Sequence, residues 1–273
     1  MIQKATDWRY TPRRSDAHMC LIAFDWQPDS DRPLVMVANR DEYFNRPTQY
    51  MDQWSDQPGI IAGRDLKASG TWLGVNTNTG HFAALTNIRH PRYRAPGALS
   101  RGGLVAGFLT TDLSADQYCR QVYQNRTQYS GFNLLLFDGR ELRYVSSEHP
   151  PLIISPGLHG LSNAGLDSND WPKVVSARKK LSRWMEMTGA TNTLASLLNS
   201  RELAPLTELP ETGIDRSIEH LLSAEFIHME GYGTRCSTAL IWQKECVEIT
   251  EISYDPHGNI LNTTQFNRLI STD

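Results

Sequence analysis

Apolar and polar residues alternate in pairs of short segments along the chain, and turn-forming residues separate the members of each pair. This pattern is typical of β-hairpins. The connecting sequences are QPDSDRP in the first hairpin, TNTG in the second and Asp138-Gly139 in the third. The predicted strand pairs are 20–26 with 33–42, 71–76 with 81–87, the two halves of 132–147, and 236–243 with 246–254, and a short strand is expected at 157–163.

Between the hairpins, apolar residues recur at helical spacing. Ser114 is placed to cap the second half of the first helical region. Asp170 is placed to cap the next helix, with Pro172 in its first turn. The buried face of that helix is expected to be Val174, Ala177, Leu181 and Trp184. The predicted segments are helices within 100–127, over 171–187 and over 192–200, and a surface loop over 201–216.

The order of these elements predicts the fold class. Hairpins, helices, a hairpin, helices and hairpins follow one another, which favours an α+β domain with largely antiparallel sheets and helices packed outside them. A doubly wound nucleotide-binding fold needs alternating βαβ units instead, and no GxGxxG or GxxxxGK[ST] motif is present. We expect one domain over 19–273, preceded by a polar extension over 1–18.

Composition and charge narrow the function classes. The 273 residues carry a formal net charge of -3, which favours neither a nucleic-acid surface nor an anionic membrane surface. No apolar run approaches the roughly 18 residues of a membrane span. The first 18 residues lack the apolar segment of a signal peptide, so a cytoplasmic location is expected. The four cysteines show no CxxC spacing and no histidine pair is spaced for metal, so no cofactor, zinc site or disulfide framework is expected.

Polar residues stand where several apolar strands end, and they are the candidate site. Arg40 and Asp41 end one strand, Asn87 and Asn163 end two others, and Arg235 is expected just before a fourth. Each has a purely structural interpretation: an Arg40–Asp41 ion pair at the end of a hairpin, asparagines in turns, and an arginine on the surface. Their grouping around one cysteine, Cys20, favours chemistry.

Met19 and Cys20 stand directly before the first predicted strand, as the start of a protein would. If Cys20 becomes the first residue, it carries an α-amino group with a pKa of about 7.7–8.0, which can act as the general base for its own thiol. A nearby guanidinium favours the thiolate, and asparagine amides can donate to an oxyanion. If the chain begins at Met1, the amine lies in a peptide bond and Cys20 is a small, partly apolar residue.

Several motifs in this order give the chain a resemblance to the NRDE family, also called transport and Golgi organisation protein 2 (TANGO2). The motifs are MCLIAFDW, ANRDEYFNRP, GTWLGVN, FAALTN, RGGLV, YSGFNLLLFD, HGLSNA and GYGTR. The resemblance covers nearly all of the chain after residue 18. The family is similar in turn to N-terminal nucleophile hydrolases, in particular choloylglycine hydrolase and penicillin V acylase.

The resemblance implies an αββα sandwich and hydrolysis of C–N bonds outside peptides. It implies that Cys20 is the nucleophile and that Arg40 and Asp41 follow the first hairpin of the site. Asn87 and Asn163 match the oxyanion-binding and amine-orienting asparagines, in either order, and Arg235 matches a late arginine near the thiol. Family members begin Met-Cys, so the 18-residue extension is the main departure.

Two functions from different classes follow. The first is an amidohydrolase in which Cys20 attacks a non-peptide amide. The second is a carrier or chaperone on the same scaffold, because the resemblance also points to haem handling and lipid metabolism, and because two arginines suit the carboxylates of haem or an acyl-CoA-like ligand. The free amine of Cys20 separates them, since only the hydrolase needs it. The oligomeric state stays open.

Overall fold

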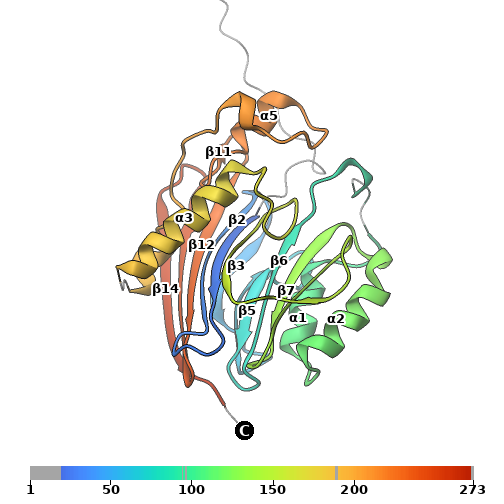
Figure 1. Ribbon diagram of the computed structural model, residues 1–273, viewed down its shortest axis with the longest axis vertical. Coiled ribbons are helices and arrows are strands. Elements are labelled where there is room, and N and C mark those ends of the chain that lie inside the picture. The colour runs from blue at the N-terminus through green and yellow to red at the C-terminus, as the bar shows by residue number, and fades with distance from the viewer. Residues whose placement is uncertain (1–19, 94, 96, 188–189, 272–273) are drawn as a thin grey trace, which may run out of the picture.

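The computed structural model describes residues 20–271 except 94, 96, 188 and 189. The expected extension over 1–18 and Met19 lie outside the described residues. Fourteen strands in this part of the chain form two antiparallel sheets (Figure 1).

The first sheet, sheet A, has the order β10-β1-β2-β12-β13-β14, and β11 also pairs with β12. Its strands are β1 (Cys20–Trp26), β2 (Leu34–Tyr43), β10 (Gly157–Leu161), β11 (His228–Met229), β12 (Tyr232–Trp242), β13 (Cys246–Tyr254) and β14 (Ile260–Leu269). The second, sheet B, runs β3 to β9 in chain order. Its strands are β3 (Thr48–Gln53), β4 (Ile60–Asp65), β5 (Leu73–Asn76), β6 (His81–Asn87), β7 (Phe132–Phe137), β8 (Leu142–Ser146) and β9 (Leu152–Ile153).

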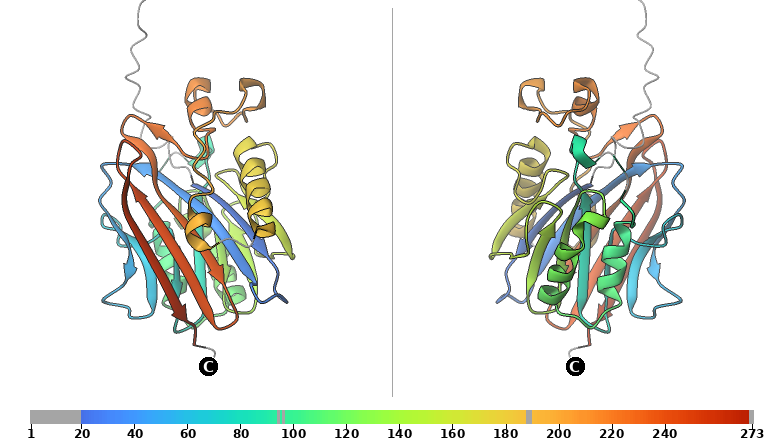
Figure 2. Two further views of the ribbon diagram at one scale, coloured as in Figure 1. Left: turned by 90° about the vertical axis from the view of Figure 1, so that its left-hand side faces the viewer. Right: turned by 90° about the vertical axis from the view of Figure 1, so that its right-hand side faces the viewer.

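The sheets pack face to face, with a helical layer on each outer face (Figures 1 and 2). Alternate residues of both sheets, such as Phe24, Met36 and Leu135, form one buried cluster between them. The helices α3 (Pro172–Glu186) and α4 (Thr191–Ala195) cover sheet A, whereas α1 (Gly102–Leu109) and α2 (Ala115–Gln124) cover sheet B. The predicted αββα sandwich with antiparallel sheets is therefore confirmed.

The predicted hairpins are present, but β3, β4, β9, β11 and β14 were not predicted. β4 lies inside sheet B, but its apolar run is only Ile60 to Ala62, too short to stand out as a strand. β3 and β14 expose most of their side chains, so they lack the apolar alternation that marks a half-buried strand. Near the end of the chain, α5 (Arg216–Leu221) begins where the expected surface loop ends. It has six residues, too few for a helical period to stand out.

Helix ends also differ from the sequence expectation. Ser114 caps α2 as predicted, but Trp171, rather than Asp170, occupies the N-cap of α3 and makes no side-chain cap bond. Pro172 lies in the first turn and fixes the start of the helix by its own backbone geometry. The helix predicted over 192–200 ends early, since α4 stops at Ala195. The expected buried face of α3 is confirmed.

Asn39 connects sheet A to its helical layer. The side chain is fully buried, and its Nδ2 donates to the backbone oxygens of Leu198 at 2.8 Å and Glu225 at 2.9 Å. Its Oδ1 accepts from the Ser237 hydroxyl at 2.6 Å. One amide thus satisfies three buried polar groups that β2, β12 and two loops bring together.

We predict that Asn39→Ala lowers the free energy of unfolding by about 2–4 kcal/mol, because it leaves two buried carbonyl groups without a donor. Urea denaturation followed by circular dichroism measures the change. Asn199→Ala is the matched control, since Asn199 is exposed in the same segment as Leu198. Equal stability of the two variants would contradict the structural role of Asn39.

Candidate functional site

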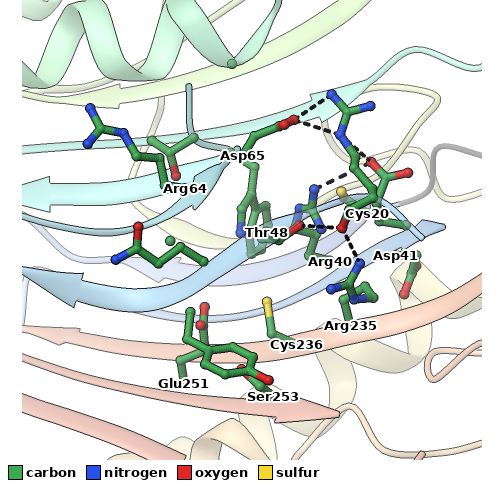
Figure 3. A pocket seen from close by; sticks show the side chains of 18 of the residues that line it. Cys20, Arg40, Asp41, Thr48, Arg64, Asp65, Arg235, Cys236, Glu251 and Ser253 are labelled. Carbon is green, nitrogen blue, oxygen red and sulfur yellow. Dashed lines mark hydrogen bonds and ion pairs between the residues drawn. The ribbon is translucent and has the colours of Figure 1, made fainter. Parts of the chain in front are cut away.

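A cleft opens where the two sheets diverge, and both sheets and the start of α1 line it (Figure 3). Sheet A contributes Cys20, Arg40, Asp41, Glu42, Arg235, Cys236, Glu251, Ser253, Tyr254 and Leu261. The rest of the wall is Arg46, Thr48, Gln49, Tyr50, Gly63, Arg64, Asp65, Thr71, Trp72, Leu85, Asn87, Ser100, Arg101 and Gly102. Five of the six site residues predicted from sequence are therefore on this wall, namely Cys20, Arg40, Asp41, Asn87 and Arg235.

Cys20 is the first residue of β1 and lies opposite Arg40 of β2. Opposite residues in an antiparallel pair project from the same face, so the thiol and the guanidinium are neighbours. Only 6% of Cys20 is exposed. Burial, and then the carboxylate of Asp41, raises the pKa of its thiol to about 12, while Arg40 opposes the shift. In the chain with a peptide bond before Cys20, the thiol is therefore protonated at neutral pH.

Asn163 holds the backbone of Cys20. Its Oδ1 accepts from the backbone N of Cys20 at 3.1 Å, and its Nδ2 donates to the backbone oxygen of Asn87 at 2.7 Å. Asn163 is fully buried, whereas the side chain of Asn87 lines the cleft. The two asparagines that the sequence left interchangeable thus differ in position: one orients the nitrogen of Cys20 and the other borders the open space.

Arg40 and Asp41 do not pair with each other. Successive residues of a strand point to opposite faces, so Arg40 turns towards the inter-sheet space and Asp41 towards the helical layer. The guanidinium of Arg40 bonds Glu42 at 3.5 Å. The Oδ1 of Asp41 accepts from the Thr234 hydroxyl at 2.6 Å, and its buried Oδ2 has no hydrogen-bond partner among the residues that the structure describes.

Lys173, in the first turn of α3, completes the polar layer behind Asp41. It is 3% exposed, and its ammonium donates to the backbone oxygen of Leu222 at 3.0 Å. Burial lowers the pKa of Lys173 and raises that of Asp41, and the attraction between the two charges opposes both shifts. A buried cation thus stands on the far side of Asp41 from the cleft.

Arg235 lies inside β12, not before it, and next to a bulge between Thr234 and Cys236. Its Nη1 donates to the backbone oxygens of Tyr43 at 2.9 Å and Arg46 at 3.0 Å. The guanidinium therefore ties down the turn between β2 and β3 while its side chain borders the cleft.

Cys236 and Glu251 form a second polar pair on the cleft wall. Cys236 lies opposite Arg40 on the side away from Cys20, so the three residues form one row across β1, β2 and β12. Glu251 accepts from the backbone N of Met51 at 2.9 Å and from the Thr238 hydroxyl at 3.1 Å. Burial raises the pKa values of Cys236 and Glu251. Since Cys20 and Cys236 are two strand spacings apart, their Cα atoms exceed the reach of a disulfide.

Sequence reasoning missed several residues of this wall. Cys236 begins a predicted strand and was not among the candidate site residues, and Glu251 gave no signal because it lies within the strand paired with it. Arg101 and Lys173 belong to segments where helical spacing was the dominant pattern. Their proximity to Cys20 depends on contacts between elements far apart in the chain, which no local pattern specifies.

The fold and the site define a class: an αββα sandwich whose cleft holds a cysteine at the first residue of an interior strand, held by a buried asparagine. No group of three or more metal-ligating side chains occurs among the residues that the structure describes. Within that same part of the chain, no helix is long and apolar enough to cross a membrane.

The chain belongs to the family Transport and Golgi organisation 2 (TANGO2), whose profile matches residues 19–256. It is 33% identical over 253 residues to the transport and Golgi organization 2 homolog of Mus musculus, with 82% of this chain and 88% of that protein covered. The Homo sapiens homolog is 33% identical over 255 residues, with the same shares covered. The Drosophila melanogaster protein is 27% identical over 273 residues, covering 88% of this chain and 95% of that protein.

A solved structure is also similar to this chain. It is the Caenorhabditis elegans ortholog of N-acylethanolamine-hydrolyzing acid amidase, with a TM-score of 0.38 and 9% sequence identity. The match covers 81% of this chain and 92% of that one. The family profile and the identity to the Mus musculus homolog confirm the resemblance to the NRDE family, and the αββα layering rests on the described strands and helices themselves.

We predict that Asp41→Asn lowers the thiol pKa of Cys20, because the substitution removes a negative charge that disfavours the thiolate. At a fixed alkaline pH, Cys20 should then react faster with iodoacetamide, as mass spectrometry of its peptide would measure. Glu251→Gln is the control, since this carboxylate adjoins Cys236 and is not a cause of the Cys20 shift. An unchanged alkylation profile in Asp41→Asn would show that the charge of Asp41 does not raise the thiol pKa.

Proposed function

We propose that this protein is an amidohydrolase of the N-terminal nucleophile type, acting on a non-peptide amide when Cys20 is the first residue. The observation that carries the proposal is the hydrogen bond between the backbone N of Cys20 and Oδ1 of Asn163, at the edge of a cleft that the thiol also borders. If the chain begins at Cys20, this nitrogen is an amine already oriented beside its own thiol.

The roles of the surrounding residues follow from their positions. The Cys20 sulfur forms a bond to the amide carbon, and the resulting oxyanion accepts hydrogen bonds from the side chain of Asn87. Arg40 favours the thiolate by its charge. The Oδ2 of Asp41, which accepts no hydrogen bond within the described part of the chain, can balance the new ammonium group.

The proton balance closes within the site. The free amine of Cys20 takes the thiol proton and returns it to the leaving amine as the C–N bond breaks. Water then attacks the thioester, giving the carboxylic acid and restoring the thiol. Asn163 keeps the amine oriented through both steps, since its Oδ1 faces that nitrogen.

A carrier without catalysis is the second candidate. The observation that favours it is the burial of Cys20, which raises the pKa of its thiol, because a protonated, buried thiol is a poor nucleophile while a peptide bond precedes Cys20. The ligand in this case would be haem or an acyl-CoA-like molecule. A shift of the haem Soret band, or thermal stabilisation by acyl-CoA, supports this function, and the absence of both counts against it.

The proposed hydrolase predicts that a chain starting at Cys20 releases amine from some member of a panel of N-acyl amides, whereas the full chain with residues before Cys20 does not. Amine release followed with fluorescamine measures this difference. In the Cys20-first protein, Asn87→Ala should lower kcat by about 10²–10³-fold, the usual effect of losing one oxyanion donor.

Two variants control this experiment. Cys20→Ala should abolish turnover, and Cys119→Ala should leave it unchanged because Cys119 lies on the buried face of α2 and does not line the cleft. Equal activity of the full chain and the Cys20-first chain would rule out the amine as base. Turnover that survives Cys20→Ala would rule out the nucleophile.

A further inference from the structure

Five arginines border the cleft, and three of them are occupied. Arg46 pairs with Asp65 at 2.6 Å, and Arg64 pairs with Asp56 at 2.7 Å. Arg235 donates to backbone oxygens of the turn that precedes β3. These three guanidinium groups therefore hold the wall together and offer little to a ligand.

Arg101 is different. It stands at the N-cap of α1 and borders the cleft, and its Nη1 donates to the backbone oxygen of Gly131 at 3.2 Å. Among the described residues, no carboxylate oxygen lies within ion-pair distance of its guanidinium. The carboxylate of Glu42 acts on Arg101 only by its charge, which raises the pKa of Arg101. Burial lowers the pKa of Arg101 to about 10, which still leaves it charged at neutral pH. A desolvated cation without an ion-pair partner is costly, so an anion beside it would stabilise the site.

Arg40 supplies a second available donor. The residue is 8% exposed, and its Nη2 contacts Glu42, but its Nη1 is buried with no hydrogen-bond partner among the described residues. Buried guanidinium nitrogens are normally bonded, so a free one on a cleft wall points to a group that the cleft receives. Arg40 also lies directly opposite Cys20.

The start of α1 adds to the positive potential. Gly102, its first residue, borders the cleft, and no side chain caps the helix. The N–H groups of Gly103 and Leu104 donate to the backbone oxygens of Ser100 and Arg101, so the contribution of the helix is its dipole, which favours an anion near the N-terminus. The start of α1, Arg101 and Arg40 thus all make the potential of the cleft more positive.

We propose that Arg101 and Nη1 of Arg40 form an anion subsite beside Cys20, which binds a carboxylate or phosphate group of the ligand. The subsite deepens the proposed function, because it restricts the substrate to amides that carry such a group near the scissile bond. Its test does not require turnover.

The test compares two alkylating reagents on the full chain, anionic iodoacetate and neutral iodoacetamide. In both reactions the cysteine sulfur displaces iodide and loses its proton to water. The rate ratio of iodoacetate to iodoacetamide reports the local potential, and Cys246 is the internal reference because it is partly exposed beside Glu245 and Glu248. We expect the ratio at Cys20 to exceed that at Cys246 by about tenfold.

Arg101→Met should reduce the Cys20 ratio severalfold, and Arg101→Lys should retain part of it. Arg140→Met is the matched control, since Arg140 is exposed on the turn between β7 and β8. Continued protection of the fully buried Cys119 shows that each variant is folded. Competition by inorganic phosphate or by acetate identifies which anion the subsite prefers.

The subsite is wrong if the ratios at Cys20 and Cys246 are equal, if Arg101→Met leaves the ratio unchanged, or if neither reagent reaches Cys20. Failure of the hydrolase is a separate result. In that case no amine is released by the Cys20-first chain, while the charge preference at Cys20 persists and depends on Arg101.

Discussion

The side-chain amide of Asn163 joins the two sheets at the point where the cleft opens. Its oxygen holds the first nitrogen of β1 in sheet A, and its nitrogen holds the last carbonyl of β6 in sheet B. Both ends of this amide are used, and the side chain is fully buried, so the separation of Cys20 from Asn87 is set by one rigid group. The nucleophile candidate and the oxyanion candidate keep their spacing because of it.

The tetrapeptide Asn39-Arg40-Asp41-Glu42 shows how strand alternation divides a motif between two tasks. Asn39 and Asp41 face the helical layer, where one bonds loop carbonyls and the other bonds Thr234. Arg40 and Glu42 face the inter-sheet space and pair with each other. The first pair fixes β2 against its neighbours, and the second carries charge into the cleft. β2 therefore stabilises the fold with one face and contributes charged side chains to the cleft with the other.

How far the sequence predicts this arrangement depends on burial. Strands buried on both faces, such as β1 and β6, form short continuous apolar runs and were predicted, and so was the buried face of α3. β3 and β14 lie at sheet edges, expose most of their side chains and were not predicted. At the site, motif order brought Cys20 and the asparagines together, but Arg101 and Glu251 enter it only because sheets and helices from distant segments converge. The same convergence gives Asn87 and Asn163 different positions, although the two are equivalent as sequence.

Charge explains why this cleft can support two kinds of function. With a peptide bond before Cys20, the nearby Asp41 carboxylate and burial both favour the neutral thiol, so the positive potential of the cleft acts on ligands rather than on sulfur. An α-ammonium at the same nitrogen would add a positive charge beside Asp41 and offset its effect on the thiol. The thiol pKa would then fall, and the same amine, once neutral, would accept the thiol proton. The proposed anion subsite is the same whether the nitrogen of Cys20 is an amide or a free amine, since neither Arg101 nor the start of α1 depends on that nitrogen. Anion binding and thiol reactivity are thus separable properties of one cleft, and only the reactivity depends on whether the nitrogen of Cys20 is a free amine.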